Sequence, residues 1–172
     1  GQAAHEGPVV PRAKAFLLEA REIQLAAHRA GLPGDEVAKL RSDAIDIVID
    51  ALYLRAGPAA ASLTLVATGG YGRAELCPLS DIDLLVLVPA HTAETKQAVE
   101  TILYPLWDVG LKVGQSVRTV AEAADYARND LHLHVALLET RLLCGERSQF
   151  AQLEMRLSEL LSGEAWQPLA KA

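Results

Sequence analysis

The chain has 172 residues, of which 51% are hydrophobic and 22% are charged, a composition typical of a globular domain with a buried core. The net charge of −6 argues against a broad nucleic-acid-binding surface, which would be basic, and hence against a template-directed polymerase. No apolar run reaches the roughly 18 residues of a membrane span. The two cysteines, Cys77 and Cys144, have no metal-binding spacing, so we expect reduced thiols in a cytoplasmic protein that binds neither nucleic acid nor membrane.

Two helices are predicted before the first strand. Residues 1–10 are small and polar and predict a flexible N-terminus, and Pro11 suits the first position of a helix that ends near residue 30. Its apolar face is predicted to contain Phe16, Ala20, Ile23 and Ala27. Asp35 is expected to cap the second helix, which Gly57 ends. The apolar face of the second helix is predicted to contain Val37, Leu40, Ala44, Ile47 and Ala51, and its solvated acidic face Asp43, Asp46 and Asp50.

Residues 63–88, LTLVATGGYGRAELCPLSDIDLLVLV, are predicted to form two buried strands around a glycine turn. Gly69 and Gly70 end the first strand and allow backbone N–H groups to approach a ligand such as a phosphate. Asp81 and Asp83 open the second strand. Because side chains alternate between the two faces of a strand, both carboxylates should point the same way.

Two neighbouring carboxylates repel each other, and each raises the pKa of the other. A divalent cation removes this repulsion, and Mg²⁺ prefers carboxylate and phosphate oxygens. Two such ions can orient an attacking hydroxyl and stabilise a leaving pyrophosphate. The sequence therefore predicts metal-dependent chemistry on a phosphate at this site. The alternative is a solvated strand start with two surface acids.

Four further helices are predicted, and the residues expected to begin them are Thr92, Thr119, Asp130 and Ser148. Pro105 should kink or end the first of these, and the third should extend over residues 131–144. The last should bury Phe150, Leu153, Leu157 and Leu160. A third strand is predicted over residues 112–119. The expected fold class is therefore α/β (α+β), with a small mixed β-sheet of three or more strands, helices on one side and helical extensions at both ends.

The glycine pair, the spacer and the Asp-apolar-Asp sequence resemble the DNA polymerase β nucleotidyltransferase superfamily. The longer string GGYGRAELCPLSDIDLLVL resembles the nucleotidyltransferase domain of the bifunctional uridylyltransferase/uridylyl-removing enzymes, which modify the nitrogen signal protein PII. The resemblance covers roughly residues 40–160. It implies a polymerase β-like nucleotidyltransferase fold in four parts: a flexible N-terminus (1–10), an N-terminal helical segment (11–60), a nucleotidyltransferase core (61–120) and a C-terminal helical segment (121–172) before further domains.

The resemblance also implies roles for the residues of the glycine turn and the aspartate pair. The catalytic residues and metal ligands that it implies are Asp81 and Asp83, with Mg²⁺ as the ion and Mn²⁺ as an alternative. The residues that it implies contact the nucleotide are Gly69, Gly70 and Ser80. Arg73 lies between the two motifs, where it either meets triphosphate charge or forms an ion pair with Glu75. Tyr71 is expected to pack in the core.

One feature departs from the superfamily pattern, in which a third carboxylate on a neighbouring strand often acts as base toward the acceptor hydroxyl. Residues 112–119 contain no Asp or Glu, although Ser116 and Arg118 alternate with Val117 and would face the site. The resemblance implies that a later segment of the longer enzymes supplies the missing acid. Metal and nucleotide binding without turnover is therefore one outcome for this chain.

The activity implied by the resemblance is transfer of UMP from UTP to a tyrosine hydroxyl of PII, with release of pyrophosphate. Transfer of AMP from ATP is an alternative. Two other functions stay open: a small-molecule nucleotidyltransferase, and a regulatory nucleotide-binding module without turnover. The former would label a small amine or alcohol in place of PII, and the latter would bind nucleotide without releasing pyrophosphate.

Overall fold

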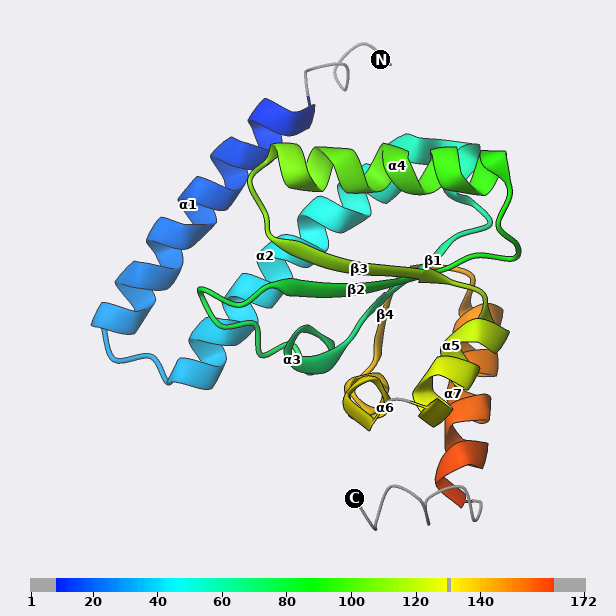
Figure 1. The fold of residues 1–172 in the computed structure, drawn as a ribbon. Helices are drawn as coiled ribbons and strands as arrows, with labels where there is room; N and C mark the ends of the chain where they lie inside the picture. Colours follow the sequence, from blue (N-terminus) through cyan, green and yellow to red (C-terminus); the bar gives the residue numbers. More distant parts are fainter. Residues whose placement is uncertain (1–8, 130, 163–172) are drawn as a thin grey trace.

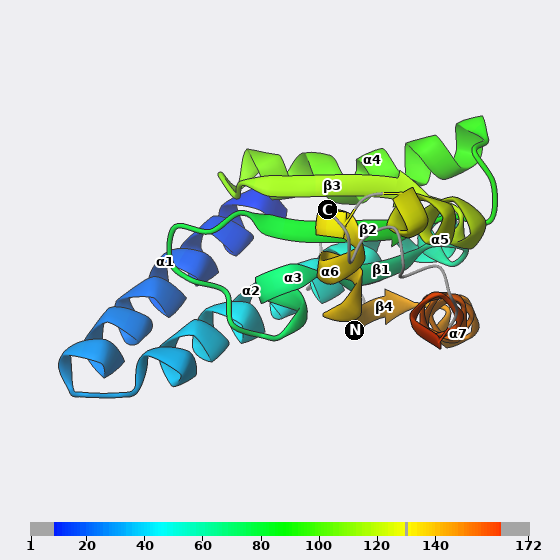
Figure 2. The same ribbon diagram turned by 60° about the horizontal axis from the view of Figure 1, so that its bottom comes forward.

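The computed structural model describes residues 9–129 and 131–162, and these form a four-stranded sheet with helices on both faces (Figures 1 and 2). The strands are β1 (Thr64–Ala67), β2 (Ile82–Leu87), β3 (Val113–Arg118) and β4 (Arg141–Gly145), in the order β3-β2-β1-β4. β2 and β3 are parallel, whereas β1 is antiparallel to both β2 and β4. The predicted mixed sheet and α/β class are therefore confirmed.

Two helices, α1 (Val9–Arg29) and α2 (Gly34–Ala56), form a hairpin before the sheet (Figure 1). The faces predicted for them are partly wrong, because Ile23 of α1 and Ile47 of α2 are both 57% exposed. The side of α2 that packs toward the sheet is shifted along the sequence and consists of Ala38, Ser42, Ala44, Ile45, Val48, Ile49 and Leu52. Both stripes have helical spacing, so the contact with the sheet decides which one is buried. α2 starts at Gly34 without a side-chain cap, so the predicted cap at Asp35 is also wrong.

The chain then runs through a 3₁₀ turn η1 (Gly57–Ala60), β1, the short helix α3 (Gly69–Gly72) and β2. α4 (Ala93–Asp108) is capped by Thr92, whose hydroxyl accepts a hydrogen bond from the Thr95 N–H at 3.2 Å. α4 continues through Pro105, so this proline does not end the helix. After β3, α5 (Val120–Asn129) begins at the predicted cap, where the Thr119 hydroxyl accepts from the Glu122 N–H at 3.2 Å.

The predicted helix over residues 131–144 is wrong in its second half. α6 (Leu131–Leu138) is followed by β4, which pairs with the edge of β1 left free by β2. Leucine and arginine are good helix formers, but strand pairing with burial of Cys144 outweighs this local preference. Gly145, with φ +104°, permits the pairing, because a Cβ there would lie 2.1 Å from the Leu63 carbonyl oxygen. The cap predicted at Asp130 lies outside the described residues.

Side chains of β1 and β2 alternate between two hydrophobic cores. Leu65, Leu84 and Val86 pack with α2 and α4 on one face of the sheet. Val66, Leu85 and Leu87 pack with α5 and α7 (Arg147–Ser162) on the other (Figure 2). The expectation of helices on one side only is therefore wrong. The face predicted for the last helix is confirmed, since Leu153, Leu157 and Leu160 are buried. None of the helices in the described stretches has the length and apolar character needed to cross a membrane.

Candidate active site

The glycine turn lies directly against the second aspartate. Gly69 has φ +57°, and a Cβ built there would lie 3.7 Å from Asp83 Oδ2. The Thr68 N–H donates to the Asp83 carbonyl oxygen at 3.1 Å, which fixes the end of β1 to the start of β2. The Thr68 side chain does not cap α3, so among the described residues the N–H groups of the first turn have no side-chain cap. These N–H groups are available to a phosphate next to Asp83.

The two aspartates lie at the start of β2, as predicted. Asp81 immediately precedes the strand and is exposed, Ile82 is buried in the core, and Asp83 lies in the strand. Partial burial, and then the charge of Asp81, raise the pKa of the Asp83 carboxyl. Within residues 9–129 and 131–162, neither carboxylate has a hydrogen-bond or ion-pair partner. Two adjacent carboxylates without a protein cation fit the requirements of a divalent metal ion.

Gly114 on β3 gives the Asp83 carboxylate its space. Asp83 pairs with Gly114 in the parallel register, and a Cβ at Gly114 would lie 3.0 Å from Asp83 Oδ1. Any larger residue would push the carboxylate aside. The sequence carried a signal for this residue, because an isolated glycine within a strand often marks a close approach. Gly114 was nevertheless not among the predicted site residues.

A cavity of about 440 Å³ opens beside Asp83 between the sheet and helices α5 and α6. Ser116 and Arg118 lie on the same face of β3 as Gly114 and line it, as their alternation predicted. Arg118 Nε donates to Ser116 Oγ at 2.8 Å, and its guanidinium carbon lies 3.8 Å from the centre of the Tyr126 ring. In the part of the chain that the structure describes, Arg118 has no acidic partner. The cleft therefore holds a positioned cation at one end and Asp83 at the other.

Arg73 and Ser80 lie outside this cleft in the structure. Arg73 Nε donates to Glu75 Oε2 at 2.7 Å, and its guanidinium also forms an ion pair with Glu139. The ion-pair alternative predicted for Arg73 is therefore present, and a triphosphate would have to compete with two carboxylates for this side chain. Ser80 is exposed directly before Asp81, and its N–H donates to the Cys77 carbonyl oxygen at 3.1 Å.

The glycine turn is supported by a network that sequence reasoning missed. Tyr71 is 1% exposed, which confirms its predicted packing role, and its hydroxyl donates to Asp46 Oδ1 at 2.6 Å. Arg141 Nη1 donates to Asp46 Oδ2 at 2.5 Å, and Nη2 donates to the Tyr71 carbonyl oxygen at 3.2 Å. Asp46 is therefore part of an ion pair and not of a solvated acidic face. Gly72 allows the turn to lie against the backbone at Glu139, because a Cβ on Gly72 would lie 1.8 Å from the Glu139 carbonyl oxygen.

Among the residues that the structure describes, no third acid joins the aspartate pair. Within the described stretches, no three His, Cys, Asp or Glu side chains meet in an arrangement that could hold a metal ion. β3 offers Gly114, Ser116 and Arg118 to the cleft, as the absence of an acid in residues 112–119 predicted. The described part of the chain thus offers a metal ion two carboxylates and offers no third acid beside them as base toward an acceptor.

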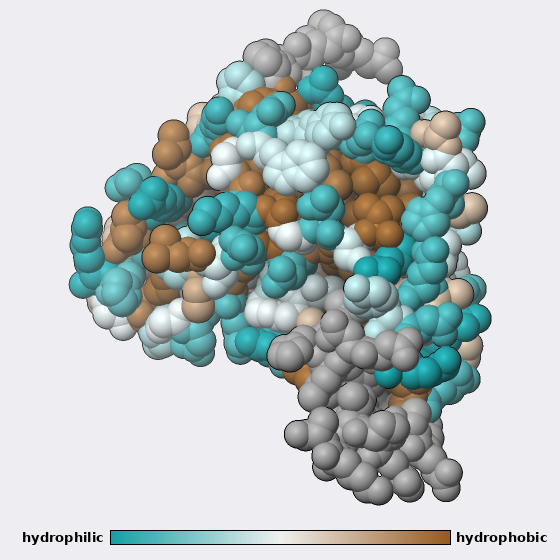
Figure 3. Space-filling view, viewed as in Figure 1, coloured by the Kyte–Doolittle hydropathy of each residue, from teal (hydrophilic) through white to brown (hydrophobic). Residues whose placement is uncertain are grey.

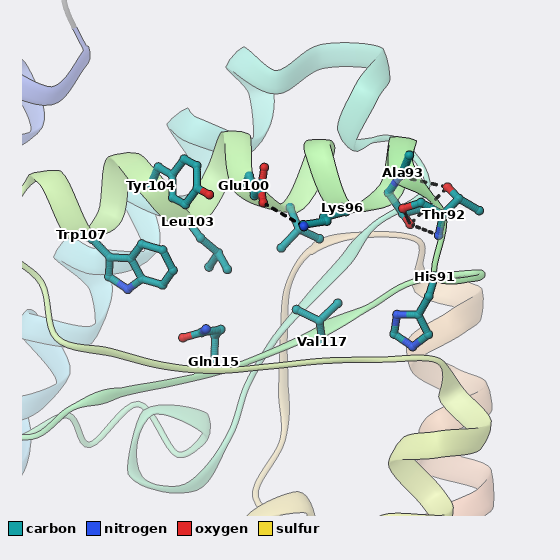
Figure 4. Close-up of a pocket in the computed structure, with 12 residues that line it drawn as sticks. His91, Thr92, Ala93, Lys96, Glu100, Leu103, Tyr104, Trp107, Gln115 and Val117 are labelled. Atoms are coloured by element: carbon teal, nitrogen blue, oxygen red, sulfur yellow. Dashed lines mark hydrogen bonds and ion pairs between the residues drawn. The ribbon is translucent and has the colours of Figure 1, made fainter.

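A second hollow lies on the opposite face of β3 and is not part of this site. It has a volume of about 570 Å³ and runs between α4 and β3, where Figure 4 shows Trp107, Leu103 and Val117 along it. In the view of Figure 1, Figure 3 shows hydrophobic surface between these two elements. Gln115 and Val117 point into the hollow (Figure 4), whereas Ser116 and Arg118 line only the cleft beside Asp83. None of the residues predicted for the metal or the nucleotide lines it.

Comparisons with known proteins agree with this geometry. Residues 56–156 match the family model described as a nucleotidyltransferase domain. The chain is 41% identical over 156 residues to the bifunctional uridylyltransferase/uridylyl-removing enzyme of Rhodopseudomonas palustris, covering 89% of this chain and 16% of that enzyme. It is 42% identical over 151 residues to the enzyme of the same name from Bordetella avium, covering 83% and 18%. For that of Aromatoleum aromaticum the identity is 46% over 126 residues, covering 73% and 14%. The chain thus spans less than a fifth of the length of these curated relatives.

Proposed function

Because the chain belongs to the nucleotidyltransferase domain family, we propose that it binds a nucleoside triphosphate with Mg²⁺ and transfers a nucleoside monophosphate to a hydroxyl acceptor. UTP is the proposed donor, with ATP as the alternative, and a tyrosine hydroxyl of PII is the proposed acceptor. The observation that carries the proposal is the pair Asp81 and Asp83, which has no cationic partner in the described chain and lies against the glycine turn. Acting on UTP and PII, the domain would work in the cytoplasm.

The residues of the site have two roles: some balance charge, and others leave space for the phosphates and the carboxylates. Asp81 and Asp83 would hold the metal ion, which would neutralise their repulsion and the charge of the triphosphate. Gly69 and Gly70 leave room for phosphate oxygens, which accept hydrogen bonds from the first turn of α3. Gly114 leaves the space in which the Asp83 carboxylate lies, because a Cβ there would crowd it. Arg118 supplies positive charge across the cleft and, with Tyr126, a flat surface for the nucleotide.

Catalysis in such a site comes from positioning and charge neutralisation. The acceptor oxygen attacks the α-phosphorus in line, and pyrophosphate leaves. Among the described residues, no third carboxylate lies beside the aspartate pair to take the acceptor proton. This observation favours a second candidate function for the chain by itself, namely nucleotide binding without turnover. A small-molecule acceptor is less well supported, because the similarity to the bifunctional enzymes extends over 89% of the chain.

The test of binding is calorimetric titration of UTP and of ATP into the chain, each with and without Mg²⁺. We expect one nucleotide to bind only with Mg²⁺, and the Asp81→Ala/Asp83→Ala variant to lose this binding. The matched control is Asp43→Ala, which removes an acid of α2 that pairs with Lys39 away from the site. Equal binding by the double variant and the control would show that the aspartate pair is not the metal site.

The test of turnover uses UTP labelled at the α-phosphate with purified PII as acceptor. Label on PII that the Asp83→Ala variant does not transfer would support the transferase and exclude the binding module. Binding without label transfer, in a chain that gains transfer when extended past residue 172, would indicate that the base lies in the added segment. Label on small amines or alcohols but not on PII would instead support the small-molecule enzyme.

A further inference from the structure

A cavity of about 630 Å³ lies between α1 and α2, away from the aspartate pair. Its remaining walls are the loop at Pro78 and Leu79 and the segment from Val109 to Leu111 that leads into β3. It shares no lining residue with the cleft beside Asp83. Its volume is within the range of about 300–1,000 Å³ that is typical of small-molecule sites. Most of its wall is apolar, as in such sites.

The charged side chains of this cavity all have one sign. Lys14, Arg21 and Arg41 line it, His28 adds a polar ring, and no acidic residue lines it. Within the described stretches, Lys14, Arg21 and Arg41 have no ion pair with any carboxylate. This is unusual in a chain of net charge −6, where acids outnumber Lys and Arg. Neighbouring cations without a counterion repel each other, and an anion between them would remove the repulsion.

Arg41 has a buried hydrogen-bond donor that the described residues leave without an acceptor. This donor is its Nε, which is fully buried. Burial, and then the charge of Arg21, lower the pKa of the Arg41 guanidinium. A buried donor without an acceptor is rare, because the group loses water and gains nothing in exchange. A carboxylate or phosphate oxygen in the cavity would supply the acceptor.

A polar side chain from the opposite wall points to the same conclusion. Gln24 is the buried residue of α1, with 9% exposure, and it lines the cavity. It has no hydrogen-bond partner in the part of the chain that the structure describes. Its amide is therefore available to a polar group inside the cavity. Leu17, Val37 and Ile45 around it offer contacts to an apolar group.

We propose that this cavity is a second binding site, for a small organic anion whose apolar body packs between α1 and α2. Its anionic group is bound by Arg21 and Arg41, and Gln24 donates a hydrogen bond to it. The site communicates with the aspartate pair through the loop that both adjoin, because Leu79 lies two residues before Asp81. The same loop is tied to α2 by the Leu76 N–H, which donates to Ser42 Oγ at 3.2 Å, next to Arg41.

The test is a fluorescence titration with 8-anilinonaphthalene-1-sulfonate, an apolar anion whose emission rises in such a pocket. We expect saturable binding of one molecule, weakened about tenfold or more in Arg41→Gln and in Arg21→Gln. Arg12→Gln is the matched control, since Arg12 is exposed on α1 outside the cavity. Decanoate should displace the dye and decanol should not. Amide shifts in α1, α2 and residues 78–80 should locate the bound dye by NMR.

Three results would overturn the proposal. Absence of saturable binding in the wild-type chain would show that the cavity does not take an apolar anion. Equal affinity in Arg21→Gln, Arg41→Gln and Arg12→Gln would show that the arginines do not bind the anionic group. Displacement by decanol as strong as by decanoate would show that the cavity binds apolar groups without recognising a negative charge. Arg21 is exposed, so its variant is expected to fold even where Arg41→Gln does not, and circular dichroism checks both.

Discussion

Gly114→Ala provides a sharp test of the metal site, because it changes one methyl group and touches the site at one atom. The added Cβ would lie 3.0 Å from Asp83 Oδ1, whereas ordinary contacts begin at 3.4 Å. The carboxylate must therefore shift by about 0.4 Å, which exceeds the tolerance of about 0.2 Å expected for a metal–ligand distance. Mg²⁺ tolerates such distortion poorly. We expect Mg²⁺-dependent UTP binding to weaken about tenfold or more, similar to the loss of a group that orients a ligand.

Calorimetry of Gly114→Ala beside Gly34→Ala measures this effect. Gly34 is a matched control, because a Cβ there meets nothing within 4 Å and its φ is not positive. Urea unfolding should show that both variants keep the stability of the wild type to within about 1 kcal/mol. A folded Gly114→Ala chain that binds UTP and Mg²⁺ as well as Gly34→Ala would refute the reasoning that Gly114 positions Asp83.

Three further predictions follow from the contacts of the site. Asp83 has a raised pKa in the folded chain, so without Mg²⁺ the folded state binds more protons than the unfolded state at pH values between the ordinary and the raised pKa. The free energy of unfolding should therefore decrease as the pH rises through this window. Urea titrations should show that Asp83→Asn removes this decrease. Arg141→Met leaves the partly buried Asp46 without its ion pair, so the free energy of unfolding measured in urea titrations should decrease by about 2–4 kcal/mol. An unchanged free energy of unfolding would mean that this network does not hold the glycine turn. Arg118→Gln should weaken UTP binding about tenfold in calorimetry with unchanged thermal stability, and wild-type affinity would exclude Arg118 from the nucleotide site.

Local sequence predicted the parts of the site that depend on neighbours in the chain. The glycine pair, the aspartates at the start of β2 and the caps at Thr92 and Thr119 are short-range features, and the structure contains all of them. The sequence also predicted that β3 presents no carboxylate to the cleft, because strand alternation alone determines which of its side chains face that way.

The parts that could not be predicted depend on contacts between distant segments. Arg141 and Asp46 are 95 residues apart, and neither carries a local signal for the ion pair that they form. β4 was mistaken for helix because its residues have little strand preference and its conformation comes from the free edge of β1. The buried face of α2 was misassigned for the same reason, since its sequence contains two apolar stripes and only the sheet selects between them.

The support of the glycine turn by β4 has a consequence for the order of events during synthesis. The Tyr71 carbonyl oxygen is bound by an arginine 70 residues further along the chain. At about 5–20 residues per second, a ribosome needs roughly 4–14 s to add that segment after the turn has been made. Throughout this interval the turn lacks its anchor, and β1 has an open edge. A nascent chain would therefore complete the proposed nucleotide site only when β4 docks, so that synthesis itself delays the appearance of the site.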